Sequence, residues 1–503
     1  MFIRKKKNKS GSISVQIIQK VRGKYNVVKT LGSSLDEAQI DLLYKQAQEA
    51  IPRLFDQITL FDDPLTSPKI EELSNDNIRI AGPELIFGKI FDIIGFNRIP
   101  DQLFKDLVIS RITHPGSKLK LSEYLRENNR QEISADNIYY FLDKLNSKYK
   151  KQVEDISFNY TKKLLNDRIG IVFYDMTTIY FESSQPDDLR ETGFSKEGKH
   201  QHPQIYLGLL IGNNGYPIGY DIFEGGIYEG HTLIPIIEKF QIRFHLEKPI
   251  IVADAGLLSN KNITALKEKE YTFILGGRIK NESNDIKKAI EQLSINDGEI
   301  AKIDKKDNTT LFVSYSETIA RKDISNRERG LRRLEKSLKS GKLTKSNINN
   351  RGYNKYLKMQ GELLIEIDYE KFELDSKWDG LKGYITNTNL AGSEVIDSYK
   401  NLWKIEKAFR ISKTDLKIRP IYHRLKERIE AHICISFASY VLFKELERVL
   451  SESATDISIN KAIKVINKMY EIIIPLPNNK IHCIRLKNNE IQQRILDIVN
   501  NNF

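Results

Sequence analysis

Three acidic residues stand where their carboxylates could hold a metal ion. Asp175 ends the apolar run GIVFYD, Asp254 ends the run PIIVAD, and Glu406 lies inside the basic segment YKNLWKIEKAFRISK. Carboxylate oxygens suit Mg²⁺, a hard cation, and the two cysteines of the chain exclude a cysteine-rich zinc site. In a chain with a formal net charge of +12, this set of acids points to a phosphodiester substrate.

The two aspartates need neighbouring strands to become one site. The sequence predicts strands over 168–181 and 248–253, so that each aspartate has a fixed backbone near a strand end. Side by side, the two carboxylates would repel each other unless a cation lay between them. Two Mg²⁺ ions about 4 Å apart could then activate an attacking oxygen and stabilise a leaving one. For either aspartate alone, a cap or turn residue is the alternative interpretation.

The segment around Glu406 is predicted to be one helix over 399–413. Tyr399, Glu406 and Lys413 recur every seven residues, close to two helical turns, so all three would lie on one stripe with Arg410. An acid flanked by an aromatic ring and two bases suits a metal ligand beside phosphate contacts. A solvent-facing helix with ordinary acid–base pairs is the alternative.

The elements around these residues indicate a mixed α/β chain. A β-hairpin is predicted over 12–33, helices over 36–165, and strands mixed with helices from 166 onward. Four strand-like runs around a long polar helix make 276–389 a β-rich insertion, and 424–450 reads as an apolar helix. Further strands are predicted over 204–211, 216–223 and 271–275.

Composition limits the class of protein. With 503 residues, 40% hydrophobic and 29% charged, the chain has room for two to four globular domains. No apolar stretch approaches the ~20 residues that span a bilayer, and the basic start lacks the apolar region of a secretory signal. Cys434 and Cys483 are too few for a disulfide scaffold, so a reducing cytosol and no membrane association are expected.

Basic residues gather in three segments. Residues 1–30 hold nine Lys and Arg and no acid, 319–358 hold thirteen against three acids, and 400–430 hold ten against four. A single charge run is usually a solvated face. Three such runs beside a carboxylate trio favour binding of a polyanion.

Taken together, the motifs resemble bacterial insertion-sequence transposases of the DDE type, the group with a β-rich insertion before the glutamate. Their signature Y-x-x-R-x-x-x-E-x-x-x-x-x-x-K is met by Tyr399, Glu406 and Lys413, while Leu402 stands in the arginine place. The aspartates lie in the similar pieces YDMTTIYFES and VADAGLLS. Other similar pieces are RITHPGSK, NIYYFLDKL and HRLKERIEAHI, so the resemblance covers about 110–435.

The resemblance implies an α/β fold with a ribonuclease-H-like catalytic core and a β-rich insertion, preceded by a β-hairpin and a helical DNA-binding region. The implied domains are a basic hairpin region 1–55, a helical DNA-binding region 56–165, a core formed by 166–275 and 390–450, the insertion 276–389 and a C-terminal region 451–503.

The resemblance also implies a reaction. Water would cut a phosphodiester at the end of an element with terminal inverted repeats, and the freed 3′-hydroxyl would attack target DNA. A homodimer in the bacterial cytoplasm, associated with the nucleoid, would bridge two ends. Two Mg²⁺ ions, or Mn²⁺, would be held by the catalytic Asp175, Asp254 and Glu406, and DNA by Tyr399, Lys404, Arg410 and Lys413. Two alternatives remain: a catalytically silent DNA-binding protein derived from a transposase, and a metal-dependent nuclease without strand transfer.

Overall fold

The chain was analysed as a computed structural model that divides into two compact units. The first unit comprises Met1–Gly82, Tyr124–Glu132 and Lys464–Arg494, and the second comprises Pro83–Glu123, Ile133–Ile463 and Ile495–Phe503. The residues that the structure describes are 2–21, 24–58, 74–129, 132–182, 185–193, 198, 200–245, 247–257, 259–349, 352–360, 364–475 and 481–503.

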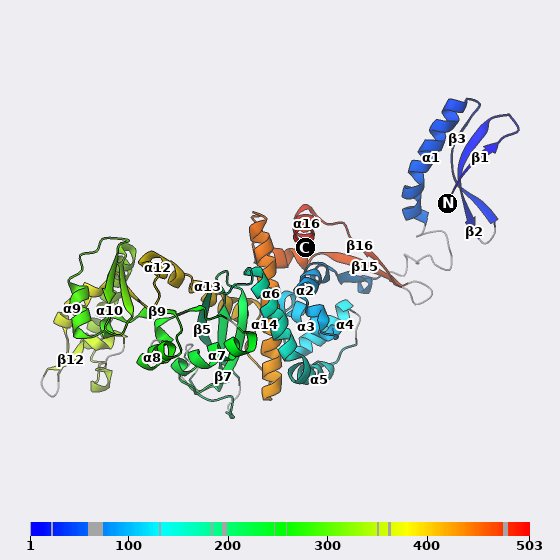
Figure 1. The fold of residues 1–503 in the computed structure, drawn as a ribbon. Coiled ribbons are helices and arrows are strands. Elements are labelled where there is room, and N and C mark those ends of the chain that lie inside the picture. Colours follow the sequence, from blue (N-terminus) through cyan, green and yellow to red (C-terminus); the bar gives the residue numbers. More distant parts are fainter. Residues whose placement is uncertain are drawn as a thin grey trace. The chain divides into compact units, whose positions relative to one another are not determined.

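The N-terminal part of the first unit is a three-stranded antiparallel sheet against one helix (Figure 1). Alternate residues Val15 and Ile17 of the middle strand are fully buried against Ile40 and Ala47 of the helix, because a strand presents every second side chain to the same face. The predicted hairpin is confirmed as the second and third strands, and its turn at 22–23 lies outside the described residues. The elements are β1 Phe2–Lys7, β2 Ile13–Val21, β3 Lys24–Ser34 and α1 Glu37–Ile58.

A second sheet of the first unit joins distant parts of the sequence. Strand β15 lies between β4 and β16 and pairs antiparallel with both. Short strands that pair over such a separation carry no local pattern, and none of the three was predicted. Their bounds are β4 Ile78–Ile80, β15 Tyr470–Pro475 and β16 Ile481–Arg485.

The second unit is built on an eight-stranded mixed sheet in the order β10-β11-β14-β9-β8-β5-β6-β7. Strand β8 runs parallel to both of its neighbours, β5 and β9, and the other pairs are antiparallel. The strand predictions from 166 to 275 are confirmed, and three strands of 276–389 extend this same sheet. The bounds are β5 Ile171–Tyr180, β6 Gln204–Ile211, β7 Pro217–Glu224, β8 Ile250–Ala253, β9 Phe273–Gly277, β10 Ile300–Asp304, β11 Thr310–Tyr315 and β14 Leu381–Thr386.

Strand β5 is buried on both faces. Val172, Tyr174 and Met176 point into one hydrophobic cluster, which Leu233 of α7 also enters, and Phe173 is buried as well. Burial on both faces explains why this strand reads as a continuous apolar run. The helices that follow the strands are α7 Leu233–Phe244, α8 Asn260–Glu268, α9 Asn284–Glu291, α10 Glu317–Lys339, α12 Gly392–Lys400 and α13 Trp403–Arg410.

The long helix α14, Lys426–Glu452, is surrounded by other elements of the second unit. It contacts α2, α3, α5, α6 and β7, and its run 431–446 is buried on every side. This agrees with the predicted apolar helix, because a helix that is apolar all round belongs in a core. Among the described residues, no helix is long and apolar enough to cross a membrane. The remaining bounds are α2 Lys89–Ile94, α3 Gln102–Thr113, α4 Lys118–Asn129, α5 Ala135–Lys144, α6 Lys150–Leu164, β12 Leu357–Gln360, β13 Leu364–Ile367, α11 Tyr369–Leu374, α15 Ile459–Ile466 and α16 Glu490–Asn502.

Candidate active site

The two aspartates lie on neighbouring strands. In the parallel pair β5–β8, Tyr174 is opposite Ala253, so the residues that follow them, Asp175 and Asp254, are adjacent. Neighbouring strands are about 4.8 Å apart, which brings both carboxylates within reach of one cation. Asp175 is half-buried, because β5 continues beyond it along β6, and Asp254 is exposed because β8 ends at Ala253.

A tyrosine from α12 fixes Asp254. The Tyr399 hydroxyl donates a hydrogen bond of 2.9 Å to Oδ1 of Asp254. Burial, and then the negative charge and hydrogen bond of Asp254, raise the pKa of Tyr399 well above its ordinary value, so the hydroxyl stays protonated as a donor. The Tyr384 ring packs edge-on against it with centroids 5.0 Å apart.

Glycine 276 makes room for that tyrosine. A Cβ at Gly276 would lie 2.3 Å from the Tyr399 hydroxyl oxygen, so any larger residue would displace the ring from Asp254. This role of Gly276 was not predicted. The sequence did contain an indication of this role, because a glycine inside a predicted strand often marks the close approach of another group.

The predicted single helix over 399–413 is wrong. Helix α12 ends at Lys400 and α13 begins at Trp403. Between them the Leu402 amide donates to the Tyr399 carbonyl at 3.0 Å, an i→i−3 bond. Such a turn advances about 120° per residue instead of 100°, so the two residues between the helices rotate Tyr399 against Glu406 by only about 40°. Beyond α13, Lys413 lies in a π-helical turn, Ile411–Asp415.

Glu406 is exposed on α13, a helix that packs against β5 and β6. Ile405, Ala408 and Phe409 form the buried face of this helix. Across the described ranges, no three His, Cys, Asp or Glu side chains form a group that could hold a metal ion. The structure therefore brings Asp175, Asp254 and Tyr399 together, and it places Glu406 on an adjoining helix without gathering a third carboxylate.

The residues predicted to contact DNA lie around α13. Lys404 donates to the Asn213 carbonyl, and burial together with nearby Lys444 lowers the pKa of its ammonium group. Arg410 is exposed, and its guanidinium group has no hydrogen bond or ion pair with another described residue, whereas Lys413 is half-buried. Leu402, in the arginine place of the signature, is only 9% exposed, so its side chain serves packing.

Helix α10 presents a basic surface. Its Arg327 is held by an ion pair of 2.6 Å to Asp379, in which both side chains are 12% exposed. Other bases of this helix project into solvent. These exposed bases are Arg321, Lys322, Arg329, Arg332, Arg333, Lys336 and Lys339.

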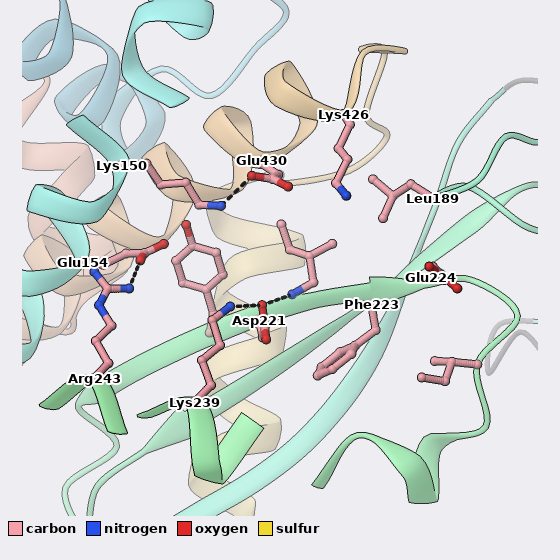
Figure 2. Close-up of a pocket in the computed structure, with 13 residues that line it drawn as sticks. Lys150, Glu154, Leu189, Asp221, Phe223, Glu224, Lys239, Arg243, Lys426 and Glu430 are labelled. Atoms are coloured by element: carbon pink, nitrogen blue, oxygen red, sulfur yellow. Dashed lines mark hydrogen bonds and ion pairs between the residues drawn. The ribbon is translucent and has the colours of Figure 1, made fainter. Parts of the chain in front are cut away.

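A cavity of about 440 Å³, here named the paired pocket, lies beside β7 (Figure 2). Lys150 pairs with Glu430 at 2.6 Å, Lys239 pairs with Asp221 at 2.7 Å, and Arg243 pairs with Glu154. These side chains come from α6, α7, α14 and β7. Because these three cations are each neutralised by a carboxylate, we assign this pocket a structural role.

Comparison with known proteins identifies one family. The family model for the transposase DDE domain matches residues 166–442, more than half of the chain. No curated protein matches the chain. A solved piggyBac transposase synaptic complex with hairpin DNA has 10% sequence identity and a TM-score of 0.39, with 82% of this chain and 79% of that chain covered. A Mos1 transposase paired-end complex with the left transposon end has 13% identity and a TM-score of 0.16, with 45% of this chain and 66% of that chain covered. TM-scores this low do not establish which residues of these structures correspond to residues of this chain.

Proposed function

This chain belongs to the transposase DDE domain family, and on that premise we propose that it moves an insertion sequence of the bacterial type by cutting and joining DNA. It is an enzyme with DDE transposase activity. We assign it to the group with the Tyr, Arg, Glu and Lys signature, with terminal inverted repeats as its binding site. The observation that carries this proposal is the adjacency of Asp175 and Asp254 on β5 and β8, with Tyr399 bonded to Asp254.

A ribonuclease-H-like core is part of the proposal. The order β7-β6-β5-β8-β9 combines three antiparallel strands with two parallel ones and supports it. We place the core in 166–275 and 390–450 and the β-rich insertion in 276–389. Regions 1–55 and 56–165 would bind the repeats, and 451–503 forms the C-terminal region.

The donor set at the strand ends suits a hard divalent cation. Asp175 and Asp254 supply adjacent oxygen ligands, and Glu406 on α13 is the third ligand in our proposal. Three carboxylates repel one another without a cation, so we place the approach of Glu406 at the step of ion and DNA binding. Two bound Mg²⁺ or Mn²⁺ ions would supply Lewis acidity and lower the pKa of an attacking water.

The residues of the chain would orient the reacting strand. The Tyr399 hydroxyl holds one oxygen of Asp254, and the other oxygen would bind the cation. Arg410 and Lys413 would contact phosphates, with Lys404 released from the Asn213 carbonyl to join them. The exposed bases of α10 would hold flanking DNA, and two copies would bridge two ends at the nucleoid.

The test uses a labelled DNA end, a target plasmid and Mg²⁺. Asp175→Asn and Asp254→Asn should each lower cleavage and joining by roughly a thousand-fold, the size of loss seen when a group that stabilises developing charge is removed. DNA binding should persist. Asp285→Asn, at an exposed aspartate on α9, is the matched control and should retain full activity.

Other results of this assay would contradict the proposal or favour one of the two alternative functions. Equal joining by Asp175→Asn would refute the catalytic assignment. Cleavage without joining by the unmodified protein would indicate a nuclease, and DNA binding alone would indicate a silent derivative.

A further inference from the structure

A second cavity of the second unit, of about 590 Å³, has five Lys and Arg side chains and two histidines in its lining and no Asp or Glu. We name it the basic pocket. Its walls are the end of α3 with the loop into α4, the loop 417–423, and side chains of α5 and α14. Its volume lies in the range of about 300–1,000 Å³ that small-molecule sites occupy. The basic residues that line it are Arg111, Lys118, Lys120, Lys417, Arg419, His423 and His432.

Two of these cations are buried without a carboxylate. Arg111 is 5% exposed and Lys118 is 7% exposed. Arg111 donates to the Lys417 carbonyl at 3.4 Å and contacts Nδ1 of His432 at 3.2 Å. The ammonium group of Lys118 has no hydrogen bond or ion pair with any residue in the described part of the chain. Burying an unmatched charge costs several kcal/mol, so this arrangement is unfavourable unless an anion enters.

The histidines do not neutralise the pocket either. Nε2 of His432 lies 3.0 Å from the Ile418 carbonyl, so that nitrogen carries the proton and Nδ1 accepts from Arg111. Burial first, and then the charges of Lys118 and Arg111, lower the pKa of His423 to about 3. Neutral histidines leave Arg111 and Lys118 as the charged groups of the interior. Burial lowers the pKa of Lys118, and Arg111 lowers it further, so a bound anion would favour the charged form of Lys118.

The carboxylate beside His423 is already engaged. Asp143 accepts two hydrogen bonds from Arg428, at 2.7 Å from Nε and 2.8 Å from the terminal nitrogen. This bidentate pair stands beside the pocket and leaves the interior cations unmatched.

We propose that the basic pocket binds the phosphate group of a nucleotide, with Arg111 and Lys118 as its ligands. Arg111 supplies a planar fork and Lys118 a point charge, the two cationic forms that recognise phosphate. The first turn of α4, capped by a bond of 3.3 Å from the Lys120 amide to Oγ of Ser117, adds the positive end of a helix. Tyr139 and exposed Tyr422 line the same cavity and offer rings for a base.

The test measures thermal unfolding of the full chain in inorganic phosphate and in chloride at equal ionic strength. Phosphate at ten times its Kd should raise the Tm by about 1.5 °C. Lys118→Met and Arg111→Met should abolish that shift. Lys151→Met, at an exposed lysine on α6, is the matched control and should keep it.

A DNA arm identifies where the phosphate comes from. If a single-stranded oligonucleotide competes with phosphate, and Lys118→Met weakens its binding about ten-fold, the occupant is a DNA phosphate. If oligonucleotide affinity is unchanged in Lys118→Met while the phosphate shift is lost, the occupant is a free nucleotide or phosphate ion. Equal Tm values in phosphate and chloride, or a shift retained in both pocket variants, would overturn the proposal. Loss of DNA cleavage in Asp175→Asn bears on the active site alone, so the two proposals fail separately.

Discussion

The paired pocket and the basic pocket are both lined by Lys and Arg side chains. They differ in whether carboxylates neutralise the buried cations. In the paired pocket, Lys150, Lys239 and Arg243 each meet a carboxylate from another element. In the basic pocket, Arg111 and Lys118 are more deeply buried and meet none among the described residues. The second unit thus neutralises charge where the role is structural, which makes the unmatched cations informative about a ligand.

The largest effect should come from breaking a pair in the paired pocket. Arg243 bonds to Glu154 and, at 2.7 Å, to Asp155, so Arg243→Met leaves two partly buried carboxylates without their cation. We expect the free energy of unfolding to fall by about 3 kcal/mol, the lower end for buried pairs, because the Arg243 side chain is 18% exposed. Urea unfolding monitored by circular dichroism measures it. Lys151→Met should change stability by less than about 0.5 kcal/mol. A loss that small in Arg243→Met would remove the contrast between the pockets.

The next effect depends on pH and belongs to the basic pocket. The pKa of His423 is lowered to about 3, first by burial and then by Lys118 and Arg111, whereas an unfolded histidine titrates near its ordinary 6.5. Between these values the unfolded chain binds the extra proton, so stability falls as pH decreases below 6.5. The slope is about 1.4 kcal/mol per pH unit for this histidine.

Comparison with His423→Phe isolates that slope from the titration of carboxylates elsewhere. The variant should lose stability less steeply between pH 6.5 and 5.5 in chloride buffer, as measured by urea unfolding at several pH values. Parallel curves for the two proteins would mean that His423 titrates normally and that the pocket does not suppress its charge. Phosphate should flatten the curve of the unmodified protein, because a bound anion favours the protonated ring.

The strands that carry the aspartates were predictable from sequence, and the basic pocket was not. Apolar runs of strand length ending near Asp175 and Asp254 predict β5 and β8. A strand that is buried on both faces has apolar residues at consecutive positions, and this pattern can be seen in the sequence. The basic pocket depends on a contact between Arg111 and His432, 321 positions apart, and no periodicity encodes such a distance. The segments RITHPGSK and HRLKERIEAHI contain Arg111 and His432, but their sequences do not show that these two residues are in contact.

The prediction of one continuous helix over 399–413 was wrong for a different reason. Heptad spacing assumes an unbroken α-helix, whereas an i→i−3 turn between Lys400 and Trp403 ends α12 before α13 begins. Tyr399, near the end of α12, donates its hydroxyl to Asp254, and Glu406 lies on the separate helix α13. Propensity could not reveal the break, because Asn401 and Leu402 both keep right-handed helical backbone angles.

The smallest effect has the opposite sign to the first and separates the two pockets most directly. In phosphate-free chloride buffer, Lys118→Met should raise the free energy of unfolding by about 1 kcal/mol, because methionine fills a similar volume without the cost of burying an unmatched ammonium group. In saturating phosphate the order should reverse, since only the unmodified protein gains the free energy of ligand binding. Paired urea titrations in the two buffers measure both values, with Lys151→Met unchanged in each. Destabilisation by Lys118→Met in chloride would show that Lys118 has a structural partner, and the basic pocket would then follow the same rule as the paired pocket.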